Sequence, residues 1–258
     1  MKINPISTRI MPNNNQKNVH KGTFVNFAAN PIGAKSKDIY QVVANRNGRL
    51  SKQQLKLLKM QELNILNFRT VNPTSVSGGT FSVRSDIDLK SLKEAGFKTV
   101  VDFRGEATND FADRCKQQGL NYFHFNLNNV INMTNSDYFV REKNEKIKIS
   151  PKFIEKLQEF FKIIKEGNVY MGCQFGIDRT NIALFMNYLM NPVVDNAPTV
   201  LTWPYERKKT VANKNIKIVK KIIKRMTPEQ RMQIGIPEDY HLMLQNRIFD
   251  LLRKNGLV

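Results

Sequence analysis

Short apolar runs alternate with longer amphipathic stretches along the chain from Thr80 onward. The apolar runs predict strands at 80–84, 98–103, 121–126 and 168–172. Apolar positions that recur at helical spacing predict helices at 88–96, 107–118, 151–166 and 179–190. Strands that alternate with helices favour a largely parallel central sheet flanked by helices, so we expect a fold of the α/β class.

The two ends of the chain differ from this middle part. Residues 1–50 are rich in asparagine, lysine and glycine, which favours a basic, disordered tail, and a helix at 51–66 is expected to begin the folded part. Near the other end, an amphipathic helix with a lysine-rich face is expected at 211–226, and two shorter helices follow it. We therefore expect a tail at 1–50, a catalytic domain at 51–195 and a C-terminal helical extension at 196–258 packed on that domain.

The strongest candidate chemistry lies between Tyr170 and Asn181, where an apolar strand leads into a loop and a buried helix follows. The loop holds Cys173, and Arg179 comes six positions later. The backbone N–H groups of such a loop and the positive end of the helix dipole bind a dianionic phosphate. The same surroundings lower the pKa of a thiol, so we expect Cys173 to be a thiolate nucleophile.

Each remaining loop position has an expected role. The planar fork of Arg179 suits two phosphoryl oxygens, and the Thr180 hydroxyl is placed to hydrogen-bond the sulfur. The expected phosphate-binding residues are Gln174, Phe175, Gly176, Ile177, Asp178 and Arg179. The alternative is that Cys173 is a small core residue near an arginine by chance. Cys115 lacks an arginine at this spacing, and we expect it to be a helix residue that faces the core.

The segment from Cys173 to Thr180 resembles the signature of the cysteine-dependent protein tyrosine and dual-specificity phosphatase superfamily. In that signature, a cysteine, five residues, an arginine and a serine or threonine follow one another. The ending Gly-Ile-Asp-Arg-Thr is similar to the form found in bacterial atypical tyrosine and phosphoinositide phosphatases, and in myotubularins. Upstream, Thr-Val-Val-Asp-Phe-Arg-Gly-Glu at 99–106 also resembles the bacterial pattern, and the likeness spans about residues 78–190.

Two positions depart from the family pattern. Gly172 stands where the family usually has a histidine that helps to order the loop. Asn181 stands where a glycine is common, and it resembles the Arg-Thr-Asn of Sac-type inositol phosphatases instead. Neither change removes a group that does chemistry.

The general acid has two candidates. The resemblance implies an aspartate on a separate upstream loop, but the chain has Asn126, Asn128 and Asn129 after the strand where it would be sought. Asp137 lies further along, and its alternative role is that of a helix cap. Asp178 lies inside the loop, where the bacterial atypical enzymes and myotubularins are thought to carry their acid. We favour Asp178, whose alternative role is an ion pair that orients Arg179.

Composition and charge limit the classes of partner that we expect. A net charge of +19 and a pI near 10 favour phosphorylated proteins, inositol lipid head groups on an acidic membrane surface or, less strongly, nucleic acid. A solvated lysine face is the plainer explanation of the 211–226 helix. Two cysteines exclude a disulfide framework. With no signal peptide and no apolar run of ~18 residues, the chain is expected to be cytoplasmic.

These patterns together predict a phosphatase that hydrolyses phosphomonoesters through a phosphocysteine intermediate, without a metal or another cofactor. Phosphotyrosine or dual-specificity protein substrates are favoured, because Gln174, Phe175 and Ile177 are uncharged where loops for polyanionic inositides often carry lysines. A phosphoinositide phosphatase is the alternative. A phosphate-binding pseudophosphatase and, less strongly, a rhodanese-like sulfurtransferase are the alternatives of other classes.

Overall fold

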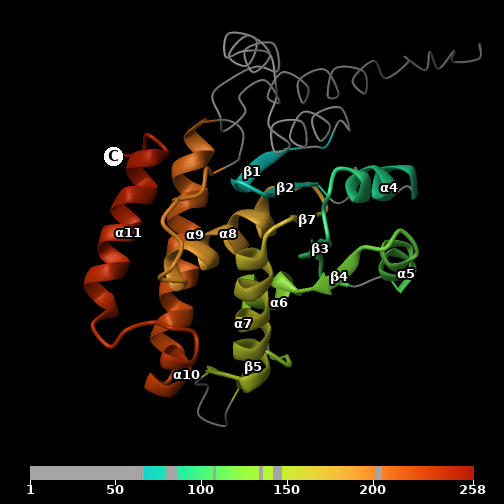
Figure 1. Ribbon diagram of the computed structural model, residues 1–258. Coiled ribbons are helices and arrows are strands. Elements are labelled where there is room, and N and C mark those ends of the chain that lie inside the picture. The colour runs from blue at the N-terminus through green and yellow to red at the C-terminus, as the bar shows by residue number, and fades with distance from the viewer. Residues whose placement is uncertain are drawn as a thin grey trace, which may run out of the picture.

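The computed structural model describes residues 65, 67–79, 86–106, 109–133, 136–141, 147–200 and 205–258 (Figure 1). Three expectations fall outside this part of the chain: the tail at 1–50, the strand at 80–84 and, apart from Ile65, the helix at 51–66.

A five-stranded sheet organises the molecule, and its strands lie in the order β1-β2-β7-β3-β4. The strands are β1 (Arg69–Asn72), β2 (Ser75–Gly79), β3 (Thr99–Asp102), β4 (Asn121–His124) and β7 (Val169–Cys173). All neighbours pair in parallel except β1, which is antiparallel to β2. The expectation of a largely parallel sheet is confirmed, and β7, which ends at the candidate nucleophile, is the central strand.

The hairpin of β1 and β2 has no counterpart among the strands that the sequence predicts. Its strands read Arg-Thr-Val-Asn and Ser-Val-Ser-Gly-Gly, so each holds a single valine among polar residues and glycines. This composition lacks the apolar run that usually marks a strand. All five residues of β2 are nevertheless buried, because β2 has a neighbouring strand on each side. A small antiparallel pair, β5 (Phe139–Arg141) and β6 (Ile147–Ile149), was not predicted either.

Different helices cover the two faces of the sheet (Figure 1). Val100 and Tyr170 pack with α4 (Asp86–Glu94) and α5 (Asn109–Gln117), and Cys115 is buried in this cluster, as expected. The next residue along each strand, Val101 or Met171, points to the other face. There the larger core includes side chains of α6 (Leu127–Asn132), α7 (Pro151–Glu166) and α8 (Asp178–Met190). Every residue of α8 from Thr180 onward is buried.

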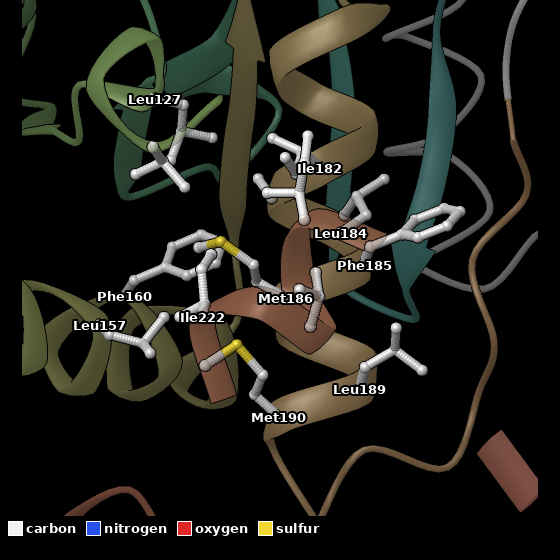
Figure 2. Packing of buried hydrophobic residues seen from close by; sticks show 14 of the residues in the cluster. Leu127, Leu157, Phe160, Ile182, Leu184, Phe185, Met186, Leu189, Met190 and Ile222 are labelled. Atoms are coloured by element: carbon white, nitrogen blue, oxygen red, sulfur yellow. The ribbon is translucent and has the colours of Figure 1, made fainter. Parts of the chain in front are cut away.

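Helix α7 spans the residues that the sequence predicted. The Ser150 hydroxyl accepts a hydrogen bond from the Phe153 N–H at 3.3 Å, and Pro151 occupies the first turn. Gly167 ends the helix with a φ of +75°, a conformation that favours glycine. Its apolar stripe includes Phe160, which packs beside α8 in the larger core (Figure 2).

Three further helices complete the described chain: α9 (Tyr205–Arg225), α10 (Pro228–Gln233) and α11 (Tyr240–Lys254). The expected lysine-rich helix is present as α9, although it begins earlier than predicted. Its apolar side joins the core of α8, and Figure 2 shows Ile222 of α9 beside Met186 and Phe160. Among the described residues, no helix is long and apolar enough to cross a bilayer.

Arg247 ties α11 to the end of α8. Its Nη1 donates to the carbonyl oxygens of Tyr188, Asn191 and Val194, and its Nη2 donates to that of Pro192 at 2.7 Å. Its guanidinium also lies over the Tyr188 ring, 5.0 Å from the centroid. One cation therefore binds four carbonyl groups where the chain leaves α8.

We expect Arg247→Lys to lower the free energy of unfolding by about 1–3 kcal/mol, because lysine lacks the fork that binds several carbonyls at once. Arg253→Lys is the control, since Arg253 makes an exposed ion pair with Asp250 and a distant contact with the Phe249 ring, and its replacement should change stability by less than about 1 kcal/mol. Urea denaturation followed by circular dichroism measures both. Equal effects would contradict the role given to Arg247.

Candidate active site

Cys173 is the last residue of β7, and only 3% of its surface is exposed. The chain then turns through Gln174 to Ile177, and α8 begins at Asp178. The strand-to-helix turn expected from the sequence is therefore present, at the carboxyl end of the central strand. Open parallel sheets place their ligands at this edge, and the first N–H groups of a helix carry its positive dipole end.

Thr180 binds Cys173 at two atoms. Its Oγ1 accepts from the backbone N–H of Cys173 at 2.9 Å and donates to the Sγ at 3.3 Å. Burial of the sulfur favours the neutral thiol, but the hydrogen bonds from Thr180 and Gly176 and the charge of Arg179 outweigh it. The pKa of Cys173 is therefore lowered. In contrast, burial raises the pKa of Cys115 to about 12.

Gly176 brings the turn into contact with the backbone of β2. Its φ is +74°, and a Cβ atom at this position would lie 2.4 Å from the carbonyl carbon of Gly78. The neighbouring strands are paired here, with Gly78 opposite Gly172 and Gly79 opposite Cys173. No side chain fits between the two backbones, so glycine is required at position 176.

Two carbonyl groups of the turn are bound from outside. Asn67 Nδ2 donates to the carbonyl oxygen of Phe175, and Arg69 Nη1 donates to that of Gly176, both at 2.8 Å. Both bonds fix the backbone of the turn, and the Gly176 N–H donates to the Cys173 carbonyl oxygen at 3.3 Å. The sequence pattern indicates a role for neither Asn67 nor Arg69. They lie more than a hundred positions upstream, in a segment without a strand signal.

The charged residues at the start of α8 carry no partner within the described chain. Asp178 is exposed and Arg179 half-buried, and neither side chain forms a hydrogen bond or an ion pair with another described residue. The ion pair considered as an alternative role for Asp178 is therefore not present there. Gln174 and Phe175 are exposed at the mouth of the turn, and Ile177 is half-buried.

Asp137, the second candidate acid, lies beside α7. Its carboxylate is bound to the Lys152 ammonium, and its backbone carbonyl accepts from the Ser150 hydroxyl. The cap of α7 is Ser150, so the alternative role of Asp137 as a helix cap is wrong. The described hydrogen bonds and ion pairs of Asp137 all lead to the start of α7, and none leads to the Cys173 turn.

The asparagines after β4 have a structural role. Asn126 caps α6 by accepting from the N–H of Asn128 at 3.0 Å, and it donates to the carbonyl oxygen of Gly105 at 2.5 Å. Asn128 approaches Gly105 so closely that a Cβ atom there would lie 2.2 Å from its side-chain nitrogen. The segment where the family resemblance places an acid instead joins β4 to the end of β3.

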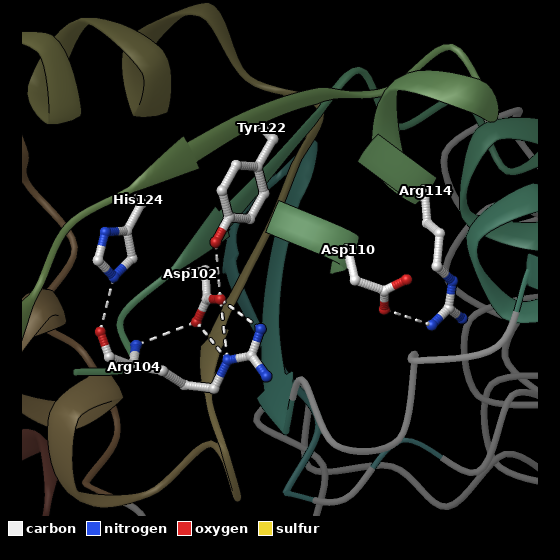
Figure 3. A network of polar contacts seen from close by, with 6 residues as sticks. All are labelled: Asp102, Arg104, Asp110, Arg114, Tyr122 and His124. Carbon is white, nitrogen blue, oxygen red and sulfur yellow. Dashed lines mark hydrogen bonds and ion pairs between the residues drawn. The ribbon is translucent and has the colours of Figure 1, made fainter. Parts of the chain in front are cut away.

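A buried carboxylate marks the same edge of the sheet (Figure 3). Asp102 is opposite Gly172, and both its oxygens accept from the Arg104 guanidinium at 2.6–2.9 Å. The Tyr122 hydroxyl donates to it at 3.0 Å, and His124 hydrogen-bonds the Arg104 carbonyl at 2.8 Å. These bonds hold the Asp-Phe-Arg segment at 102–104, which is part of the stretch that resembles the bacterial pattern.

No protein-family model matches this chain, and no curated protein matches it. Among solved structures, the chain is similar to a "Putative phosphatase (DUF442)" from Shewanella putrefaciens CN-32. Identity is 14%, 64% of this chain and 97% of that chain are covered, and the TM-score is 0.38. The Yvh1 phosphatase domain from Chaetomium thermophilum shows 11% identity, coverage of 66% and 93%, and a TM-score of 0.30. Tk-PTP in its active form shows 12% identity, coverage of 70% of this chain and 97% of that chain, and a TM-score of 0.29. We therefore infer the activity from the residues of the site itself.

Gly176→Ala should weaken the binding of orthovanadate, a phosphate analogue, by roughly tenfold or more, because the turn must move off β2. Gly96→Ala is a matched control: its φ is +85°, but nothing lies within 4 Å of an added Cβ. It should share the strain of about 1–2 kcal/mol and keep the wild-type affinity. Calorimetric titration measures the affinity for vanadate. Thermal melting measures the loss of stability that the backbone strain causes. Unchanged affinity in Gly176→Ala would contradict the role of this contact.

Proposed function

We propose that this protein is a cysteine-dependent phosphatase that hydrolyses phosphomonoesters through a phosphocysteine intermediate. The observation that carries the proposal is the Cys173 turn: a thiol whose pKa is lowered, at a helix N-terminus, next to an arginine. A core cysteine without a chemical role needs none of these features, as Cys115 illustrates.

In the proposed reaction, the Cys173 thiolate attacks phosphorus in line, so an S–P bond forms while the P–O bond to the leaving group breaks. Arg179 and the N–H groups of the turn hold the equatorial oxygens, where negative charge gathers in the transition state. Water then attacks the phosphocysteine and releases inorganic phosphate. The hydrogen bond from the Thr180 hydroxyl stabilises the thiolate as it leaves.

Asp178 is the proposed general acid that protonates the leaving oxygen. It is exposed at the end of the turn, and its carboxylate is not engaged by another described side chain. Asp137 would have to give up Lys152 to serve in this role. A position fixed by the turn also needs no loop closure before reaction.

The proposed substrates are phosphotyrosine or dual-specificity protein substrates. Gln174, Phe175 and Ile177 give the turn no positive side chain between the nucleophile and Asp178. Phe175 is 50% exposed, and its ring is suited to pack against the aromatic ring of a phosphotyrosine. An uncharged mouth selects a single phosphate on an apolar group more readily than a polyphosphorylated ring.

One observation favours phosphoinositides as a second candidate. A groove of about 1140 Å³ between α9 and α11 is lined by Lys214, Lys217, Lys220, Lys221 and Lys224. Within the described chain, none of the five forms an ion pair. Lysine clusters of this size on amphipathic helices attract anionic head groups, and α9 packs on α8, the helix that begins at the turn.

Purified protein should hydrolyse para-nitrophenyl phosphate, and Cys173→Ser should reduce kcat roughly a thousandfold or more, because the hydroxyl is not ionised at neutral pH. Cys115→Ser should leave kcat unchanged. Vanadate binding without turnover between pH 5 and 8 would reject the enzyme and indicate a phosphate-binding pseudophosphatase.

The same assay tests the acid. Asp178→Asn should flatten the basic limb of the pH–rate profile and slow an alkyl phosphate by about 10²–10⁴, because its basic leaving group needs the proton. Para-nitrophenyl phosphate, with a better leaving group, should be slowed less. Asp137→Asn should change neither. The opposite result would assign the role to Asp137.

Phosphotyrosine peptides should give a higher kcat/KM than phosphoinositides in anionic vesicles. Lys217→Glu/Lys221→Glu should leave peptide hydrolysis unchanged. The control is Lys162→Glu/Lys165→Glu on exposed positions of α7. Two results together would establish the second candidate instead. The first is a higher kcat/KM on phosphoinositide vesicles than on phosphotyrosine peptides. The second is a loss of phosphoinositide hydrolysis in Lys217→Glu/Lys221→Glu that the control variant does not show.

A further inference from the structure

Arg69 is a buried arginine behind the phosphate-binding turn. It lies on β1, and 1% of its surface is exposed. Its Nη1 donates to the Gly176 carbonyl oxygen at 2.8 Å, and its Nη2 donates to Asn181 Oδ1 at 3.0 Å. One guanidinium therefore joins the middle of the turn to the first turn of α8.

This contact explains one departure from the family pattern and bears on the other. Asn181 stands where glycine is common, and a glycine would offer Arg69 no side-chain oxygen. Gly172 stands where a histidine usually helps to order the turn, and a glycine has no side chain with which to do so. Arg69 provides order from the opposite side, through the Gly176 carbonyl.

The charge of Arg69 has no carboxylate partner. No described acid forms an ion pair with it, and its Nε has no hydrogen-bond acceptor among the described residues. Burial lowers the pKa of Arg69 to about 10, and the nearby Cys173 thiolate opposes this shift. The group remains a cation at neutral pH. A buried unpaired cation is costly, and the anions placed to offset it are the thiolate and a bound phosphate.

A purely structural arginine has a different setting in this chain. Arg247 also binds several carbonyl groups, but it is half-buried and its nearest groups belong to the end of α8. Arg69 instead binds the turn that carries Cys173, and it is fully enclosed. The two residues therefore form a natural pair for comparison.

We infer that Arg69 and Asn181 form a buried strut that orders the phosphate-binding turn and stabilises the Cys173 thiolate, replacing the histidine that the family has before its cysteine. Arg69 acts as a positioning residue, since its hydrogen bonds go to Gly176 and Asn181 and not to a reacting atom. The inference rests on the proposed function for its catalytic consequence, but not for its effect on the thiol.

The test is the pH dependence of Cys173 alkylation by iodoacetamide, read by mass spectrometry with Cys115 as the internal control. Arg69→Met should move the midpoint of the alkylation profile of Cys173 up by about one pH unit, because loss of the cation raises the pKa of the thiol. Arg247→Met should lower the melting temperature and leave the alkylation profile unchanged. Vanadate affinity should fall in Arg69→Met and stay at the wild-type value in Arg247→Met.

Asn181→Asp separates charge from geometry, and it keeps the inference testable if Arg69→Met does not fold. Aspartate still accepts from Arg69 but neutralises its charge, so the midpoint of the alkylation profile should move up about as far as in Arg69→Met. Asn181→Gly should weaken vanadate binding by loss of the strut. Wild-type alkylation and vanadate binding in both Asn181 variants would overturn the inference.

The outcome is distinct from that of the phosphatase assay. Alkylation and vanadate binding need no turnover, so an inactive wild-type protein with Arg69-dependent alkylation would reject the phosphatase function and retain the strut. An active enzyme whose Arg69→Met and Asn181→Asp variants alkylate as wild type would retain the function and reject the strut.

Discussion

The contact between the backbones of Gly176 and Gly78 is the constraint on which the site depends. Parallel pairing places β2 directly beside β7, and the turn after Cys173 folds back over the glycines at the end of β2. From that position Arg69 and Asn67 reach the outward carbonyls, and Thr180 reaches the sulfur. A side chain at Gly176 would separate these groups, although none of them would change identity.

Charge is distributed unevenly at this edge of the sheet. Arg69, Arg179 and the N-terminus of α8 lie near the thiol, and the Asp102 carboxylate at the same edge of the sheet is bound by a cation of its own. Asp102 is held by Arg104 and Tyr122, and Asp137 by Lys152. Neutralised acids do not repel a dianion. Among the described residues, Asp178 is the acid of the turn that no cation binds.

Local patterns in the sequence predicted much of this arrangement. The limits of α7 follow from a serine cap, a proline and a glycine, and the turn follows from an apolar strand before Cys173 and an apolar helix after it. The β1–β2 hairpin was missed because its burial comes from pairing rather than from apolar residues. The role of Arg69 was missed because its partners are 107 and 112 positions away, and no local periodicity reports such a contact.

The two cysteines lie in cores on opposite faces of the sheet, Cys115 with α5 and Cys173 with α8. The sheet separates them, and the chain contains no third cysteine. An accessible thiolate is the form that peroxide oxidises to a sulfenic acid, and many such sites are protected when a neighbouring thiol closes a disulfide. This fold offers Cys173 no such partner. If peroxide oxidises Cys173 to a sulfenic acid, its reduction therefore requires a thiol from outside this chain, and without one further oxidation becomes irreversible.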